Sequence, residues 1–397
     1  MTQTVTQKIM ALNGAEAIAE AMRQINPDVV ASYPITPQTI IVERFSEFVA
    51  DGLVDTEFVA AESEHSALSA SIGAAAAGGR SMTATSSQGF ALMWEMLYIA
   101  AAMRLPIVMA VANRALSGPI NIHCDHSDSM GGRDSGWIQL YSENVQEAYD
   151  NTVLAVKIAE RQNVRLPVMV CMDGFTTSHA VERVDVLDDD VVKKFVGEYH
   201  IDHPLLDVNQ PVSYGPLALP EYYFELKMQQ IDAMTNAKPV IEQVSRAYGS
   251  ISGRSYGLVE PYNMEKAERA IVILGSTAGT AKSLLDDLND PRLGLLKIRA
   301  FRPFPAAEIA ANLRKCKAVA VLDRAASYGS IGGPVFSEVR AALYDESKRP
   351  QIVSYIYGLG GRDTTTDMLK TVYDDLDTIA KTGKPDPVQR FLGLRED

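Results

Sequence analysis

The stretch DVVASYPITP, residues 28–37, joins a short apolar run to a turn that carries two prolines. A proline fixes its φ angle and lacks a backbone N–H, so the strand predicted for 28–33 ends at the prolines and no helix begins before Gln38. In open α/β sheets, ligands bind at the carboxyl ends of the strands. We therefore expect this backbone and the Thr36 hydroxyl to line a binding site, although the spacing is also typical of a plain strand-to-helix turn.

Similar apolar runs alternate with longer amphipathic or small-residue segments along the next 130 or so residues. The runs are continuously apolar, which is typical of parallel strands covered on both faces. The alternation predicts an α/β fold with a doubly wound parallel sheet. The predicted strands are 28–33, 57–60, 81–85, 106–112 and 167–172, and the predicted helices are 13–24, 38–50, 66–77, 92–103 and 144–161.

A second series of strands and helices follows an acidic, then Pro/Tyr-rich, then helical, then Gly/Ser-rich stretch. At 397 residues the chain is longer than one hydrophobic core usually serves. We predict a larger domain at 1–235, a linker at 236–257 and a smaller α/β domain at 258–397. In the second domain the predicted strands are 270–275, 295–300, 317–322 and 351–357, and the predicted helices are 278–288, 306–315, 334–344 and 365–376.

The composition argues against several classes of protein. A net charge of -13 repels nucleic-acid backbones and anionic lipid surfaces. The first residues lack the cationic and apolar regions of a signal peptide, and no run approaches the roughly 18 apolar residues that span a bilayer. We expect a cytoplasmic protein that has neither nucleic acid nor a membrane as a partner.

The cysteines and histidines do not form a recognisable metal motif. Cys124, Cys171 and Cys316 are far apart in the sequence, so they suggest neither disulfides nor an iron–sulfur site on this chain. The cluster HCDHSD at 123–128 contains possible ligands, but neighbouring side chains in a loop seldom converge and no later His or Cys pair completes a shell. We expect a hydrogen-bonded loop there and no metal site.

Two acidic residues stand at the entrance of the small-residue helix that follows the second predicted strand. The sequence ESEH occupies 62–65, and the alanines after it are explained by close packing alone. The helix dipole favours exposed carboxylates at such a position, whereas a buried one would suit proton transfer. Glu64 is therefore a candidate catalytic residue.

Two further strands are followed by polar residues. Arg114 could bind a substrate carboxylate through two parallel hydrogen bonds, or it could pair with a structural carboxylate. The sequence SSQG at 86–89 could line the same edge of the sheet or simply cap a helix. In the second domain, segments 299–305 and 324–334 mix Arg, Gly and aromatic residues, so we expect a domain or subunit contact there, with plain loop packing as the alternative.

Together these motifs resemble the α subunit of the pyruvate:ferredoxin oxidoreductase family, in order and over essentially the whole chain. The resemblance implies a pyrimidine-binding domain for thiamine diphosphate, followed by a domain like the transketolase C-terminal domain. It implies that Glu64 contacts N1′ of the aminopyrimidine, that the backbone at Pro34 and Ile35 meets that ring, and that Thr36 and Arg114 face the 2-oxoacid. The motifs that carry the resemblance are YPITP at 33–37, ESEH at 62–65, Asn113-Arg114, DHSD at 125–128 and RPFP at 302–305.

The implied reaction is the coenzyme A-dependent oxidative decarboxylation of pyruvate to acetyl-CoA and CO2 with reduction of ferredoxin, or its reverse. The nearest string to the family's diphosphate motif, Met172-Asp173-Gly174, lacks a matching downstream Asn. The resemblance therefore implies that Mg²⁺, the diphosphate site and the [4Fe-4S] clusters lie on β, γ and δ subunits, or on fewer fused partners, in a dimer of heteromers.

Other functions stay open at this point. A related α subunit could act on 2-oxoglutarate, a branched-chain 2-oxoacid or oxalate, but Thr36 is small and neutral and argues against a second substrate carboxylate. A non-catalytic assembly subunit and a stand-alone α/β protein that binds an anionic metabolite are the alternatives from other classes.

Overall fold

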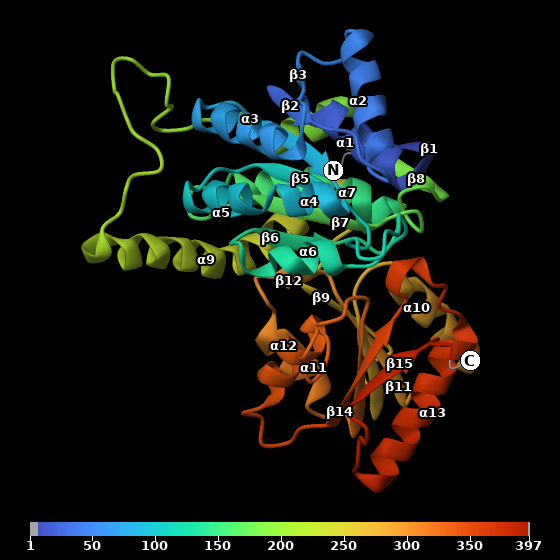
Figure 1. Ribbon diagram of the computed structural model, residues 1–397. Coiled ribbons are helices and arrows are strands. Elements are labelled where there is room, and N and C mark those ends of the chain that lie inside the picture. The colour runs from blue at the N-terminus through green and yellow to red at the C-terminus, as the bar shows by residue number, and fades with distance from the viewer. Residues whose placement is uncertain (1–6, 396–397) are drawn as a thin grey trace.

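The computed structural model describes residues 7–395, so the first six residues of the N-terminal stretch considered above and the last two residues of the chain lie outside the described residues. The chain forms two large sheets, which Figure 1 shows one above the other, the N-terminal one in blue to green. Parallel pairing dominates both sheets, as the continuously apolar runs predict.

The N-terminal sheet has seven strands, and the strands that bear on the candidate site are neighbours within it. The order is β12-β6-β7-β5-β4-β2-β3, and only the edge strand β12 is antiparallel to its neighbour. Helices cover both faces, as Figure 1 shows. The strands are β2 (Val29–Ser32), β3 (Glu57–Ala60), β4 (Ser81–Thr85), β5 (Val108–Asn113), β6 (Ile138–Tyr141), β7 (Val168–Asp173) and β12 (Ala300–Arg302).

The helices of this part of the chain alternate with its strands. A separate two-stranded antiparallel ribbon pairs β1 (Gln7–Asn13) with β8 (Val181–Leu187), which the apolar pattern did not predict. The helices are α1 (Gly14–Ile25), α2 (Thr39–Ala50), α3 (Glu64–Ala76), α4 (Ser87–Leu92), α5 (Trp94–Ala102), α6 (Ser127–Gly131), η1 (Gly132–Asp134), α7 (Val145–Ala159), α8 (Asp189–Val196) and α9 (Pro220–Ser252).

The C-terminal sheet has six strands in the order β15-β14-β13-β10-β11-β9, with β9 antiparallel at one edge. Its strands are β9 (Val259–Tyr262), β10 (Arg269–Ile273), β11 (Leu293–Ile298), β13 (Ala318–Asp323), β14 (Gln351–Tyr357) and β15 (Gln389–Leu392). Its helices are α10 (Thr277–Leu288), α11 (Ala306–Leu313), α12 (Pro334–Leu343), η2 (Leu359–Gly361) and α13 (Thr366–Thr382).

Two predicted segments differ from the structure in their helices. The helix predicted for 92–103 is two helices, α4 and α5, that meet at Met93. The predicted linker at 236–257 is largely the second half of α9, whose Ala237 and Ile241 are fully buried in the N-terminal hydrophobic core, where α9 contacts α7. The helical pattern predicted for 225–246 is confirmed, and burial of Ala237, Ile241 and Tyr248 makes this helix part of the N-terminal core as far as Ser252.

The strand predicted for 295–300 divides between the two sheets. β11 ends at Ile298 in the C-terminal sheet, and the chain enters the N-terminal sheet at Ala300 as β12. Between them, the buried Arg299 guanidinium donates to Asn151 Oδ1 at 2.7 Å. Lys297 and Arg299 alternate with apolar residues on both sides of this crossing, so the residue pattern does not mark where the chain changes sheets.

The two sheets share part of one hydrophobic core. Met109 and Tyr141 of the N-terminal sheet belong to the same buried cluster as Leu296 and Val319 of the C-terminal sheet. The segment 299–305 that we expected to make a domain contact does so through β12. Within residues 7–395, no helix combines the length and apolar character that crossing a membrane requires.

Candidate active site

The predicted site residues follow neighbouring strands at one edge of the N-terminal sheet. Thr36 follows β2, Glu64 follows β3 and Arg114 follows β5. Since these strands are parallel neighbours with β4 among them, their carboxyl ends lie side by side. The sheet order therefore brings the predicted residues together at the edge where α/β proteins bind ligands.

Glu64 is the buried carboxylate of the ESEH motif. It is the first residue of α3, whose N-cap Ser63 accepts a hydrogen bond from Ser66 N at 3.2 Å. Its side chain is only 6% exposed, whereas Glu62 is exposed and hydrogen-bonds Ser66. The two carboxylates at the start of the helix thus differ in their exposure to solvent: Glu62 is exposed, and Glu64 is buried in the protein.

The Glu64 carboxylate lies against the bare backbone of Gly89. A Cβ on Gly89 would stand 2.5 Å from Glu64 Oε1 and 2.5 Å from Thr85 Oγ1. The hydroxyls of Thr85 and Ser86 are buried and have no hydrogen-bond partner within residues 7–395. Ser86 makes no side-chain cap to α4, so SSQG at 86–89 is not a simple helix cap. Thr85 was not among the predicted site residues, although the Ser/Thr pattern of β4, SMTAT, places hydroxyls along this strand.

Arg114 is buried and reaches across to the β2 turn. Its Nη1 donates to the Thr36 carbonyl at 2.9 Å and its Nε to the Asn121 carbonyl at 3.0 Å. Within residues 7–395 it forms no ion pair, so the structural pairing considered above is not made. Burial lowers the pKa of Arg114 below its ordinary value, and Asp128 opposes that shift. With no hydrogen bond from Nη2 among the described residues, the guanidinium can still bind a carboxylate.

The YPITP turn holds its backbone open. Pro34 and Thr36 are exposed, and Ile35 is half-buried. The buried Gln38 fixes the turn from below: its Oε1 accepts from Ile35 N at 3.1 Å and its Nε2 donates to Ser32 Oγ at 3.2 Å. The turn therefore presents main-chain groups next to Arg114 without covering them.

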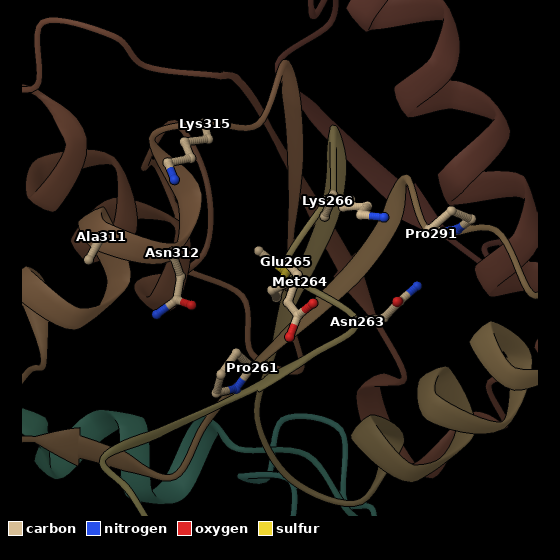
Figure 2. Close-up of a pocket in the computed structure, with 10 residues that line it drawn as sticks. Pro261, Asn263, Met264, Glu265, Lys266, Pro291, Ala311, Asn312 and Lys315 are labelled. Atoms are coloured by element: carbon tan, nitrogen blue, oxygen red, sulfur yellow. The ribbon is translucent and has the colours of Figure 1, made fainter.

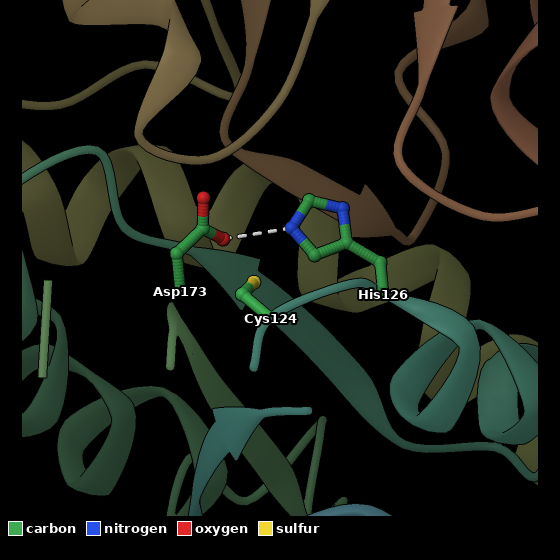
Figure 3. A group of neighbouring side chains, drawn as sticks. All are labelled: Cys124, His126 and Asp173. Atoms are coloured by element: carbon green, nitrogen blue, oxygen red, sulfur yellow. Dashed lines mark hydrogen bonds and ion pairs between the residues drawn. The ribbon is translucent and has the colours of Figure 1, made fainter. Parts of the chain in front are cut away.

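The cluster at 123–128 is hydrogen-bonded, as expected, but only residues 123–126 form a loop, since Ser127 and Asp128 begin α6. Figure 3 shows Cys124, His126 and Asp173 side by side, with His126 Nε2 at 2.7 Å from Asp173 Oδ1. Arg324 Nη1 donates to Asp173 Oδ2 at 2.8 Å, so the buried carboxylate is paired with a guanidinium. His123 instead packs on the Phe175 ring.

Asp173 therefore joins the two sheets. It ends β7, whereas Arg324 follows β13 and Ser276, which donates its backbone N–H to Asp173 Oδ2 at 3.0 Å, precedes α10. Although burial would raise the pKa of Asp173, His126 and Arg324 hold it well below the ordinary value. The segment 324–334 that we expected to make a domain contact does so through Arg324.

A cavity of about 620 Å³ lies elsewhere, in the C-terminal part of the chain (Figure 2). It is open to solvent, and none of the predicted site residues lines it. Its lining includes Lys266 and Lys315 at the amino ends of β10 and β13, which is the edge opposite the one that meets the N-terminal sheet. Because this cavity lies away from all of the predicted site residues, we do not assign it as the candidate active site.

Comparison with known proteins gives a consistent result. Residues 20–246 match the family model described as pyruvate flavodoxin/ferredoxin oxidoreductase, thiamine diphosphate-binding, and residues 267–369 match pyruvate:ferredoxin oxidoreductase core domain II. The chain is 56% identical to the pyruvate synthase subunit PorA of Thermotoga maritima over 98% of both chains. It is 47% identical to PorA of Methanocaldococcus jannaschii, over 98% of this chain and 99% of that protein.

A solved structure shares the fold. A 2-oxoglutarate:ferredoxin oxidoreductase from Magnetococcus marinus, with 2-oxoglutarate, coenzyme A and succinyl-CoA bound, aligns with a TM-score of 0.72 over 92% of this chain. The chain spans 65% of the length of that protein's chain, and the two are 20% identical. This similarity concerns the fold alone.

Proposed function

Because this chain belongs to the pyruvate:ferredoxin oxidoreductase family as its α subunit, we propose that it supplies half of a site at which pyruvate is oxidised to acetyl-CoA and CO2. The observation that carries the proposal is the buried Glu64 carboxylate, 6% exposed, against the bare backbone of Gly89 at a strand-end edge. Ferredoxin would take the electrons, and the reaction could also run in reverse.

The residues at this edge fit the aminopyrimidine ring of thiamine diphosphate. Gly89 lets the Glu64 side chain pack closely against the backbone, Glu64 offers a buried carboxylate, and the buried hydroxyls of Thr85 and Ser86 are unpartnered within residues 7–395. When bound, this cofactor supplies a carbon nucleophile and an electron sink for 2-oxoacid chemistry. Glu64 would hold a proton at N1′ of the ring, and the exposed backbone at Pro34 and Ile35 would contact the ring.

Arg114 and Thr36 would bind the substrate. The guanidinium is fixed by two main-chain carbonyls, those of Thr36 and Asn121, which leaves its second terminal nitrogen for the pyruvate carboxylate. The small, neutral Thr36 beside it suits a 2-oxoacid with one carboxylate. Both side chains would therefore orient pyruvate rather than transfer protons.

Partner chains would complete the enzyme. The cysteines of this chain are all buried and separate, and Asp173, in the string nearest to a diphosphate motif, is engaged by His126 and Arg324. We propose that β, γ and δ subunits, or fewer fused chains, hold Mg²⁺ and the [4Fe-4S] clusters, and that coenzyme A is a co-substrate. A dimer of such heteromers in the cytoplasm is the assembly we propose.

The substrate is tested on the purified native complex with a panel of 2-oxoacids. We expect ferredoxin reduction with pyruvate to exceed that with 2-oxoglutarate, branched-chain 2-oxoacids or oxalate, because the Arg114 region offers one carboxylate site. Comparable rates with 2-oxoglutarate would contradict the assignment of pyruvate.

The role of Glu64 is tested by Glu64→Gln in the assembled complex. We expect pyruvate-dependent ferredoxin reduction to fall by about 100-fold or more, since a glutamine cannot take up the proton. Glu62→Gln is the matched control, because that carboxylate is exposed two residues away and should not matter. Bound thiamine diphosphate is quantified in both variants. Unchanged turnover in Glu64→Gln would indicate a non-catalytic subunit.

A further inference from the structure

One buried carboxylate ties together the ends of β4 and β5. Asp128 Oδ2 accepts from Ser87 N at 3.0 Å and from Arg114 N at 2.9 Å. Asp128 Oδ1 accepts from Asn113 Nδ2 at 2.8 Å and from Ser129 N at 2.7 Å. The residue is 1% exposed, so all four bonds are made inside the protein.

Only a carboxylate can make this set of bonds. The four donors need an acceptor with two equivalent oxygens and no N–H or O–H of its own, whereas an asparagine would turn two of the contacts into donor-to-donor repulsions. Burying the group is unfavourable: burial raises the pKa of Asp128 to about 6, and the hydrogen bonds oppose this shift. The Asp128 carboxylate is buried at a cost in free energy, and each of its two oxygens accepts two hydrogen bonds, which indicates that it holds the surrounding backbone in place.

The two strand ends that Asp128 joins carry groups of the proposed site. Ser87 has a φ of 45°, which is a strained value for a residue with a side chain, and it opens the helix that places Gly89 against Glu64. Arg114 projects its guanidinium from the other strand end onto the Thr36 carbonyl. The two hydrogen bonds to Asp128 Oδ2 therefore hold the Ser87 turn, which leads to Gly89 beside Glu64, at a fixed distance from the backbone of Arg114.

We propose that Asp128 is a positioning residue for the pyruvate site, setting Arg114 and the Ser87 turn relative to each other without contacting the substrate. This inference rests on the proposed function of Arg114 and Glu64. It also gives the 123–128 cluster a second task, since His126 contacts Asp173 while Asp128, in the first turn of α6, holds the proposed site.

The test is steady-state kinetics of Asp128→Asn in the assembled complex. We expect kcat/KM for pyruvate to fall by about 10- to 100-fold, because displacement of a binding group by up to about 1 Å has effects of this order. Both KM and kcat should change, because the substitution displaces Arg114, which would bind the substrate, together with the Ser87 turn, which positions Gly89 against Glu64. Asp150→Asn is the matched control: Asp150 is also fully buried and binds Arg254 and Tyr248 away from the site. It should lower stability and leave the KM for pyruvate unchanged.

Two further variants separate the possible failures. Arg114→Ala should raise the KM for pyruvate, and an unchanged KM would overturn the proposed substrate role together with this inference. If Arg114→Ala raises KM while Asp128→Asn matches Asp150→Asn, only the positioning role of Asp128 is overturned. Should Asp128→Asn not assemble, Asn113→Ala removes one donor to Oδ1 and leaves the carboxylate in place. It should shift KM in the same direction by a smaller factor, and wild-type kinetics would overturn the inference.

Discussion

At the scale of single residues, the proposed site depends on a glycine at position 89, where any larger residue would lack space. Gly89 has no Cβ, and that absence provides the space for Glu64 Oε1 and Thr85 Oγ1, each of which a Cβ would approach to 2.5 Å. Neither group can retreat freely, because Glu64 is 6% exposed at the start of α3 and Thr85 ends the fully buried β4. One methyl group would therefore displace the carboxylate.

The first prediction is that Gly89→Ala lowers pyruvate turnover by about 10- to 100-fold while the complex still assembles. Gly73→Ala is the control, since it lies in α3 and a Cβ there meets nothing within 4 Å. That control should keep full activity and be slightly more stable, by roughly 0.5–1 kcal/mol. Turnover by Gly89→Ala equal to that of Gly73→Ala would show that the Glu64 position is not critical.

At the scale of elements, strand ends hold the helices that follow them. β13 ends in Asp323, whose carboxylate accepts from Val335 N at 2.7 Å and Phe336 N at 3.0 Å in the first turn of α12. Gly333, the N-cap, lacks a side chain that could do this. Burial raises the pKa of Asp323 to about 7, and the two backbone bonds oppose this shift. The start of α12 thus depends on a carboxyl group at the end of the preceding strand, 12 residues before Val335.

The second prediction concerns pH. Because the pKa of Asp323 is raised in the folded state, the folded form binds more protons than the unfolded one, and stability falls as pH rises from about 4 to about 7. Hydrogen exchange of the first turn of α12, corrected for intrinsic rates, should therefore speed up over this range and level off above it. Asp323→Asn should remove the slope, and a wild-type slope in that variant would exclude Asp323 as its source.

At the scale of the whole molecule, the two sheets are joined by buried charge as well as by apolar packing. Arg324 and Asp173 are 5% and 1% exposed; Arg324 directly follows β13 of the C-terminal sheet and Asp173 ends β7 of the N-terminal sheet. Next to them, Gly361 N donates to the Cys124 carbonyl at 2.6 Å and Asn121 Nδ2 to the Gly360 carbonyl at 3.0 Å. The loop that carries the Arg114 contact is thus held by the C-terminal part of the chain.

The third prediction is that Arg324→Met destabilises the chain by about 3 kcal/mol, because removal of one partner leaves the buried Asp173 charge poorly compensated. The urea midpoint of the assembled complex measures the effect. Arg292→Met is the control, since its pair with Asp290 is 61% exposed on the arginine side and should hardly alter the midpoint. Equal midpoints for the two variants would refute an ion-pair contribution at the junction.

The sequence alone predicted most of the parallel strands and the candidate residues of the site. Continuous apolar runs identified β2 to β5 and β7, because burial on both faces of a parallel sheet is encoded in consecutive residues. The prolines after β2 and the polar residues after β3 and β5 placed Thr36, Glu64 and Arg114 at strand ends. Their geometry agrees with that prediction, and their roles remain proposals.

Only the tertiary structure decided how these residues are supported. Asp173 and Arg324 are 151 positions apart, and Arg299 meets Asn151 across 148, so no local pattern could pair them. In the sequence Asp128 is one of several neighbouring polar residues. Only the order of the strands brings the backbone N–H groups of Ser87 and Arg114 to the same oxygen, Asp128 Oδ2. Periodicity reports which side chains are buried, whereas the partners of a buried charge depend on how distant strands are ordered in space.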